Sequence, residues 1–411
     1  MDRGTAVLLD CLKKDEGEAK LSCLQSFSLE DWEAAGRAAA QNRLAPLLYH
    51  ILKPYLNKLP AAGSTGKELR SAYLATAARN IKHYRQLLGL VEIFQAENIP
   101  LILLKGSHLA ELVYGNLALR PMSDMDLLVK AEDLGKVDTV MKREGYSSAE
   151  DKQGYSFEHL PPYSKPGAIM IEIHFHIVEP PYSKRFEVSE LWERAQRETI
   201  EEVDVMTFSP EDLVLHICYH AGVHHGFNAG LVPLLDIDRI ADYYSSCLNW
   251  DLCRRRAEDW GMERALYLVV ALTSKITGMP IPSGLTEHMP SAAELKEVIS
   301  TTEEIIFDQK EGASKFISRL FSDEPVKEKL ALIKSRILPD REFMFLPGQD
   351  DGTGNPAKIT IAKAYLSRFR GLFTRHAKSV WLGLRRDPQT IAAMKEESKR
   401  NRLRKWLGKD Q

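Results

Sequence analysis

Hydrophobic residues recur at helical spacing through most of the chain and at strand spacing only near its middle. Apolar positions three and four residues apart predict helices through residues 5–95 and again through 209–278. Three short apolar runs between these regions predict strands, at 99–106, 124–130 and 168–178. Two helical patterns follow the first two runs, at 107–115 and 131–146. The sequence therefore predicts an α+β, helix-dominated fold, with a small mixed β-sheet core flanked by helical N-terminal and C-terminal regions.

Capping and linker signals mark the ends of several of these elements. Ser28 and Ser209 precede helical patterns as N-caps, and Asp212 completes a capping box with Ser209. Residues 61–66 predict a linker between two helices, and residues 346–356 predict a loop.

Composition and charge place the chain among soluble globular proteins without naming a partner. Hydrophobic residues make up 44% and charged residues 27% of its 411 positions, and the formal net charge is −2. The five cysteines form no CxxC pair, which argues against a zinc ribbon or a disulfide scaffold and favours a reducing compartment. The N-terminal apolar run is too short for a signal peptide, and no apolar stretch is long enough to span a bilayer. We expect a cytoplasmic protein without a transmembrane segment.

Basic residues concentrate at the C-terminal end. Residues 355–411 contain fifteen Lys or Arg and four Asp or Glu, with aromatic residues interleaved. A tail of this kind can bind an anionic partner, either nucleic acid or a membrane surface. The simpler interpretation is a solvated helix face whose charge is offset by the acidic remainder of the chain.

The second strand run carries two carboxylates on one face. Asp124 and Asp126 are two residues apart, so both side chains point to the same side of a strand. Two carboxylates so close do not both stay ionised without a compensating cation, and Mg²⁺ prefers carboxylate oxygens. Glu172 lies on the polar face of the third strand run, together with His174. Three carboxylates on neighbouring strands can hold two Mg²⁺ ions, the arrangement that clamps the attacking and leaving oxygens in phosphoryl or nucleotidyl transfer.

Residues suited to phosphate binding precede these carboxylates in the sequence. The first strand run ends at Gly106, and Ser107 opens the next helical pattern. Glycine lets the backbone approach a ligand closely, and a helix N-terminus presents free N–H groups to an anion. Lys105 and Arg120 add charges that can pair with phosphate.

In this order, the motifs resemble the nucleotidyltransferase superfamily, which has the DNA polymerase β-like fold. That superfamily has a GS helix start, then Dx[DE] on the next strand, then a separate acidic strand residue. More narrowly, the chain is similar to a largely uncharacterised bacterial subfamily. The matching residues are LLKG at 103–106, Tyr114, Arg120, DMDLLV at 124–129 and IEIHFHI at 171–177. The resemblance spans about residues 25–300, and it requires the loop around residues 114–123 to fold back.

The resemblance implies a role for each matching residue. Gly106 and Ser107 would bind the β- and γ-phosphates of an NTP, most simply ATP, with Lys105 and Arg120 beside them. Asp124 and Asp126 would ligate both Mg²⁺ ions, and Glu172 would hold the catalytic ion and orient or deprotonate the acceptor hydroxyl. The acceptor itself, whether small molecule, glycan, peptide or protein, is not indicated. The implied regions are N-terminal helices (1–95), the catalytic core (96–200), acceptor-binding helices (201–300) and C-terminal helices with the basic tail (301–411).

Two other functions fit part of this pattern. A DxD glycosyltransferase would use the same metal chemistry with a nucleotide-sugar, but it normally has a larger Rossmann-like sheet before the DxD. A non-catalytic nucleotide-binding module of the same fold would keep the motifs without turnover. The presence of all three carboxylates disfavours this last interpretation.

Several histidines and a second DxD have simpler explanations. His174 and His176 form an HxH that can bind zinc, although we favour His174 as a partner of the catalytic carboxylates. His216, His220 and His224 are spaced four residues apart on one predicted helix, which can form a metal-binding face; we favour the simpler interpretation that they line a cleft or pack in the core. Asp236 and Asp238 lie in a helical pattern, where residues two apart do not share a face, so we leave them out of the catalytic set.

Overall fold

The N-terminal region is a group of packed helices. The computed structural model describes residues 1–15, 17–148, 158–179, 182–307 and 399–408. Its first four helices are α1 (Arg3–Leu12), α2 (Gly17–Gln25), α3 (Leu29–Gln41) and α4 (Ala45–Leu52). Ser28 caps α3 as predicted: its hydroxyl accepts from the Asp31 amide, and the Asp31 carboxylate accepts from the Ser28 amide. This capping box fixes where α3 begins.

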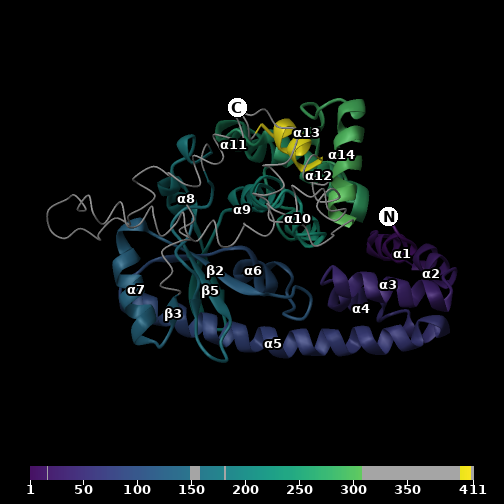
Figure 1. Cartoon of the computed structure of the whole chain (residues 1–411), viewed down its shortest axis with the longest axis horizontal. Helices are drawn as coiled ribbons and strands as arrows, with labels where there is room; N and C mark the ends of the chain where they lie inside the picture. Colours follow the sequence, from purple (N-terminus) through teal and green to yellow (C-terminus); the bar gives the residue numbers. More distant parts are fainter. Residues whose placement is uncertain (16, 149–157, 180–181, 308–398, 409–411) are drawn as a thin grey trace, which may run out of the picture.

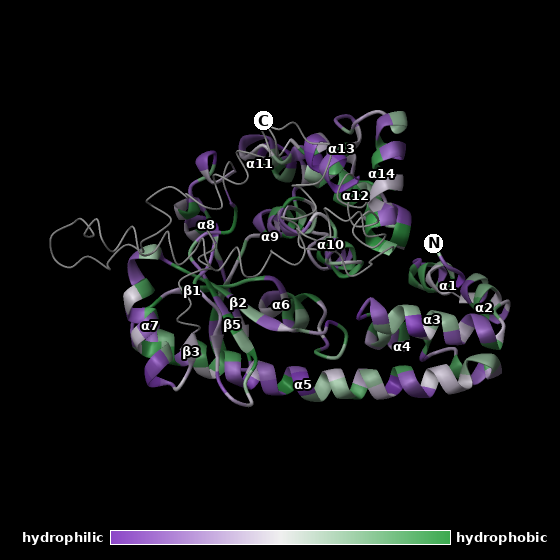
Figure 2. Ribbon diagram, in the orientation of Figure 1, coloured by the Kyte–Doolittle hydropathy of each residue, from purple (hydrophilic) through white to green (hydrophobic). Residues whose placement is uncertain are grey.

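The long helix α5 (Gly63–Ala96) connects the N-terminal helices to the sheet (Figure 1). It starts inside the segment 61–66, so the predicted linker is wrong and the glycines there are accommodated in the first turn of the helix. Purple and green bands alternate along α5, as expected for a helix that packs on one side only (Figure 2). Its second half buries apolar side chains against the sheet core, including Leu87, Val91 and Phe94.

A mixed sheet holds the residues that need a functional explanation. Within the described residues it has the strand order β3-β4-β5-β2-β1-β7-β6. Its three central strands match the predicted runs: β1 (Leu101–Leu103), β2 (Asp124–Val129) and β5 (Met170–His174). Strand β2 pairs antiparallel with β1 and parallel with β5. The predicted α+β, helix-dominated fold with a small mixed sheet is confirmed.

Two pairs of strands extend the sheet beyond the predicted runs. On one side lie the short strands β3 (Ser147–Ser148) and β4 (Tyr163–Ser164). On the other side lie β6 (Gln196–Ile200) and β7 (Val203–Thr207), an antiparallel hairpin whose β7 pairs parallel with β1. The hairpin corrects the prediction that the run at 168–178 is the last strand of the chain. Its turn residues Glu201 and Glu202 both have positive φ, 47° and 73°, without a glycine to indicate a turn in the sequence.

Helices flank these strands and continue the chain. After β1 come the short α6 (Lys105–His108) and a π-helical turn, η3 (Leu109–Val113), where one longer helix was expected. After β2 comes α7 (Leu134–Arg143), and after β5 comes α8 (Val188–Arg194). Six helices and one π-helical turn complete this part of the described residues: α9 (Pro210–Cys218), η6 (Tyr219–His224), α10 (Val232–Tyr243), α11 (Trp250–Trp260), α12 (Glu263–Thr277), α13 (Ser283–Thr286) and α14 (Ala292–Phe307).

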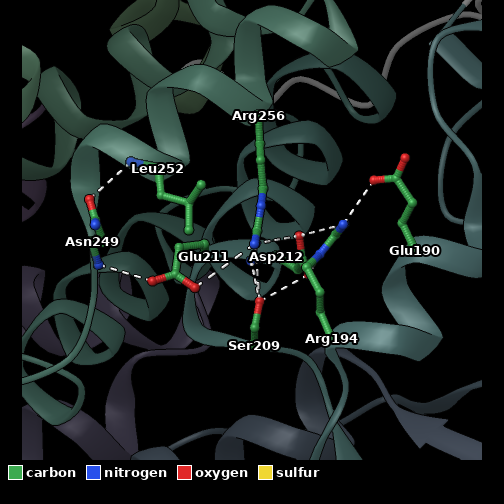
Figure 3. A network of polar contacts seen from close by, with 8 residues as sticks. All are labelled: Glu190, Arg194, Ser209, Glu211, Asp212, Asn249, Leu252 and Arg256. Carbon is green, nitrogen blue, oxygen red and sulfur yellow. Dashed lines mark hydrogen bonds and ion pairs between the residues drawn. The ribbon is translucent and has the colours of Figure 1, made fainter.

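A buried ion-pair network joins α8, α9 and α11 (Figure 3). Asp212 is fully buried, and it accepts from Arg194 Nε at 2.8 Å and from Arg256 Nη1 at 3.0 Å. Its amide bonds Ser209 Oγ at 3.2 Å, so the predicted N-cap is present. Two guanidinium groups compensate a carboxylate that would otherwise be costly to bury, which fixes these three helices against one another.

The C-terminal predictions fall mostly outside the described residues. The predicted loop at 346–356 and most of the basic tail lie there, and of the tail the structure describes residues 399–408. Trp406 in this segment donates to Glu294 on α14 at 2.8 Å. Among the described helices, none combines the length and apolar character that crossing a membrane requires.

Candidate active site

Asp126 and Glu172 face each other across two parallel strands. They are direct partners in the register of β2 and β5, so their side chains leave the same face of the sheet. With His174, two residues further along β5, they place three metal-ligating atoms within 4.8 Å of one another. Period-two alternation on β5 sets this arrangement, because it buries Ile171 and Ile173 on the opposite face.

Two cationic or hydrogen-bonding groups converge on one oxygen of Asp126. Lys105 Nζ lies 2.7 Å from Oδ1, and His174 Nε2 lies 2.9 Å from the same atom. Burial alone would raise the pKa of Asp126, but Lys105 and His174 outweigh it and hold that pKa well below the usual range. Burial would also lower the pKa of Lys105, and the Asp126, Glu172 and Asp124 carboxylates raise it instead. Asp126 is therefore a charged carboxylate in a buried position.

Asp124 lies at the more exposed start of β2. It lines the same cavity as Asp126 and Glu172 but does not belong to the group of three close ligand atoms. Partial burial raises the pKa of Asp124, and the Asp126 and Glu172 charges raise it further. This is the electrostatic signature of a carboxylate cluster that a divalent cation would stabilise.

Glu172 and His174 interact at longer range. His174 Nε2 lies 3.7 Å from Glu172 Oε2, and the imidazole lowers the pKa of this carboxyl although burial opposes it. Burial would lower the pKa of His174, but Asp126 and Glu172 raise it. The position of His174 beside both carboxylates is the one expected for a partner of the catalytic acids, and it also allows direct metal ligation.

The chain turns sharply where β1 ends. Lys105 has φ 43°, in the left-handed region, and α6 begins at this residue with Leu104 as N-cap. The expectation that Ser107 opens the helix is wrong by two residues, because the Ser107 amide already bonds the Leu104 carbonyl at 3.0 Å. Ser107 is fully buried, and its Oγ has no hydrogen-bond partner within the described residues.

Gly106 and Arg120 are in close contact at this turn. A Cβ on Gly106 would lie 2.6 Å from Arg120 Nη1, so the guanidinium occupies the space that any side chain would need. Arg120 also donates from Nε and Nη2 to Asp236 on α10, both at 2.8 Å. Lys105, Gly106 and Arg120 line the cavity, and Ser107 is not among its lining residues.

The loop between α6 and β2 folds back, as the resemblance requires. Asn80 on α5 donates its amide to the carbonyls of Leu117 and Arg120, at 2.7 and 2.9 Å. Tyr114 donates to Asp236 at 2.9 Å. These bonds fix both ends of the loop and place Arg120 beside Gly106.

The cavity itself has a volume of about 380 Å³ and lies between the sheet and the helices after it. Its sheet side carries the carboxylates, and its helical side carries His220, His224 and Asn228. Arg43, from the junction of α3 and α4, and Glu158 also line it, and nothing in the sequence pattern indicated them. Their contribution depends on contacts between segments far apart in the chain.

The remaining histidines and aspartates lie in different environments. His216 is buried, and His220 and His224 stack with ring centroids 5.5 Å apart. His176 accepts hydrogen bonds from the amides of residues 177 and 178. Asp238 pairs with Lys14 at 2.9 Å, away from the Arg120–Asp236 pair. The two aspartates on α10 therefore serve different contacts, as their spacing on a helix predicts.

Comparison with known families gives the site its context. A family described as "Uncharacterised nucleotidyltransferase" matches residues 28–278, more than half of the chain. The chain belongs to this nucleotidyltransferase family. The match covers β1, β2 and β5 with all the candidate site residues, and continues through α12. The predicted resemblance is thereby confirmed.

Two solved structures are distant matches to this member of the family. One is the antibiotic-resistance factor ANT(2'')-Ia, at 15% identity, and the other is an antigenic nucleotidyltransferase-like protein from Paracoccidioides brasiliensis, at 16%. Each alignment covers 45% of this chain and 92% of the other, with a TM-score of 0.30. No curated protein matches the chain.

Proposed function

We propose that the protein is a Mg²⁺-dependent enzyme that transfers a nucleoside monophosphate from an NTP to an acceptor and releases pyrophosphate. The observation that supports this most is the register that places Asp126 opposite Glu172, with Asp124, Lys105 and Gly106 on the same cavity. Membership of a nucleotidyltransferase family supports the NTP as donor. ATP is the first candidate among the NTPs, and the acceptor class stays open.

The residues present fit a divalent cation. Asp126, Glu172 and His174 offer three ligand atoms within 4.8 Å, and Asp124 on the same cavity adds a further carboxylate for a second ion. The Lys105 ammonium, 2.7 Å from Asp126, now supplies positive charge where a metal ion would. When bound, Mg²⁺ would neutralise the charge that develops on the transferring phosphate.

Each residue then has a defined task. Asp124 and Asp126 would hold the cations, and Glu172 would hold the catalytic cation, orient the acceptor hydroxyl and take its proton. The acceptor oxygen forms a bond to the α-phosphorus as the bond from that phosphorus to the bridging oxygen breaks, and pyrophosphate leaves. Gly106 allows the triphosphate to approach the backbone, and Lys105 moves from Asp126 to a phosphate oxygen once metal is bound. Arg120 presents Nη1 from beside Gly106, and His174 keeps Asp126 and Glu172 in place.

The region of helices on the other side of the cavity would bind the acceptor. His220, Asn228 and Arg43 supply hydrogen-bond donors there, opposite the carboxylates. A cavity wall of this kind suits a polar acceptor that presents a hydroxyl. The basic tail stays a candidate for binding an anionic partner.

The test is transfer of label from NTPs labelled at the α-phosphate, with Mg²⁺ and cell extract as the acceptor source. Asp126→Asn and Glu172→Gln should each reduce transfer by about 100-fold or more, because each removes a charged metal ligand. The matched control is Glu132→Gln, an exposed carboxylate just after β2, which should keep full activity. Transfer that survives the combined Asp124→Ala and Asp126→Ala change would refute the assigned site.

The same assay separates the alternatives. Binding of UDP-sugars in preference to NTPs would favour a glycosyltransferase. Tight NTP binding without turnover, over a broad set of acceptors, would favour a binding module.

A further inference from the structure

A second group of ligand atoms lies apart from the three catalytic carboxylates. Glu158 precedes β5, Glu179 follows it, and His224 is the last residue of the π-helical turn η6. His224 Nδ1 lies 3.6 Å from Glu158 Oε2 and 3.9 Å from Glu179 Oε1, and all three atoms lie within 4.8 Å of one another. Glu158 and His224 line the same cavity as Asp126.

These spacings suit a shared ion better than hydrogen bonds. Separations of 3.6 and 3.9 Å exceed hydrogen-bond length. Ligands at about 2.1 Å from one tetrahedral ion lie about 3.4 Å apart, so a small inward movement would close the site. His224 Nδ1 is buried, and within the described residues it has no hydrogen-bond partner. This ring nitrogen therefore faces two carboxylate oxygens, one from each glutamate.

The supporting contacts hold the two glutamates in place. Tyr219, which is 1% exposed, donates its hydroxyl to Glu158 Oε1 at 3.2 Å and accepts from the Glu179 amide at 2.7 Å. One buried side chain thus positions both acidic segments against η6. Glu158 keeps Oε2 toward His224 while its other oxygen is bound, the arrangement found where an outer residue orients a metal ligand.

We infer that Glu158, Glu179 and His224 form a binding site for a divalent transition ion, zinc in the first instance. Imidazole nitrogen and carboxylate oxygen are both zinc donors, and three protein ligands leave a fourth position open, whereas Mg²⁺ prefers oxygen ligands and water. The Glu179 side chain is 35% exposed, so the ion has a path from solvent and a free position for water. The ion would join the strand rim to the helical side of the cavity, where an acceptor oxygen can complete its coordination.

The test measures zinc alone, with the full chain and without nucleotide, so it is independent of the proposed transfer reaction. Competition with a chromophoric chelator gives the zinc affinity and the number of ions bound. His224→Ala and Glu179→Gln should each lose one bound zinc, through a weakening of about 100-fold or more, and Tyr219→Phe should weaken the same ion by about 10-fold. His288→Ala, which removes an exposed histidine elsewhere, should bind zinc as the unaltered chain does.

Two measurements protect the result against a folding defect. Thermal unfolding of each variant without metal shows whether the fold is retained, and Glu179→Gln changes a partly exposed residue without changing its size. X-ray absorption at the zinc edge of the zinc-loaded, unaltered chain should show imidazole nitrogen together with carboxylate oxygen as ligands. Unchanged zinc content and affinity in folded His224→Ala and Glu179→Gln would overturn the assignment.

Discussion

Arg120 and Asp236 form a bidentate ion pair between the loop before β2 and helix α10. Arg120 Nε and Nη2 each lie 2.8 Å from an Asp236 oxygen, and Asp236 is fully buried. The pair joins the proposed phosphate-binding end of the candidate site to the helices that form the opposite wall of the cavity. Positioning of Arg120 therefore depends on a residue 116 positions away.

Replacing one member of this ion pair should be relatively more destabilising than replacing both members together. Asp236→Leu and Arg120→Leu alone each leave a buried unpaired charge, which we expect to reduce the free energy of unfolding by about 3–5 kcal/mol. The double variant should lose clearly less than the sum of the two single changes, because neither charge remains. Urea unfolding of the four proteins measures this coupling, and additive losses would show that the pair is not a coupled unit.

Lys105 should compete with divalent cations for Asp126. Removal of the ammonium in Lys105→Gln leaves the Asp126 charge poorly compensated, so the metal-free variant should unfold at lower temperature. Added Mg²⁺ should then raise its unfolding temperature more than that of the unaltered chain, while nucleotide affinity should fall because a phosphate partner is lost.

The control for this measurement is Lys136→Gln. Lys136 is exposed on α7 and pairs only at 3.5 Å with Asp133, so it should respond to Mg²⁺ as the unaltered chain does. Equal Mg²⁺ shifts in Lys105→Gln and in the unaltered chain would argue that the ammonium does not occupy the metal position.

The candidate site shows which relationships a sequence can reveal. Period-two spacing predicts that Asp124 and Asp126 lie on one face of their strand. It predicts likewise that Glu172 and His174 lie on one face of theirs, because this depends only on local geometry. The register that sets Asp126 opposite Glu172 depends on how two strands 46 positions apart slide past each other, which the family resemblance implied and local pattern did not. The pairing of Lys105 with Asp126 was not foreseen, since the charge of Lys105 suits a phosphate equally well.

Two further features of the structure could not be predicted from local sequence patterns. The hairpin of β6 and β7 lies at the sheet edge, where charged residues such as Arg197, Glu198 and Asp204 hide the strand pattern. The Arg120–Asp236 pair and the cluster around His224 join segments from separate parts of the chain, and no local signal indicates such contacts. Tertiary packing decides them.

His216 should make the protein sensitive to acid. The pKa of His216 is lowered to about 3, chiefly by burial and also by Lys105 and His174, while Asp126 and Glu158 act in the opposite direction. The unfolded chain has an ordinary imidazole pKa of about 6.5, so it binds the proton first as the pH falls. Stability contributed by keeping this residue neutral is present above pH 6.5 and is lost between pH 6.5 and 3.

This linkage predicts a measurable slope. Between pH 7.5 and 5.5, His216 alone should account for about 1.4 kcal/mol of lost unfolding free energy. His216→Leu removes two ring nitrogens that have no hydrogen-bond partner within the described residues, so it should fold and lose that much less over the same interval. Urea unfolding at both pH values measures the difference, with exposed His288→Gln as the variant that should keep the original slope. An unchanged slope in His216→Leu would mean that folding does not shift the pKa of His216.

Gly106 should tolerate no side chain, whereas Gly135, a helical glycine with open space around it, should tolerate one. In Gly106→Ala the new Cβ would lie 2.6 Å from Arg120 Nη1 and 3.2 Å from Met122 Cγ, so the guanidinium must shift although Asp236 holds it. We expect a loss of about 1–3 kcal/mol in unfolding free energy from this overpacking, and weaker NTP binding because the phosphate end of the cavity is displaced. Gly135→Ala is the matched control: nothing lies within 4 Å of its Cβ on α7, so it should be neutral or stabilise by up to about 1 kcal/mol. Isothermal titration with a non-hydrolysable NTP and urea unfolding test both parts, and equal behaviour of the two alanine variants would contradict the role given to the Gly106–Arg120 contact.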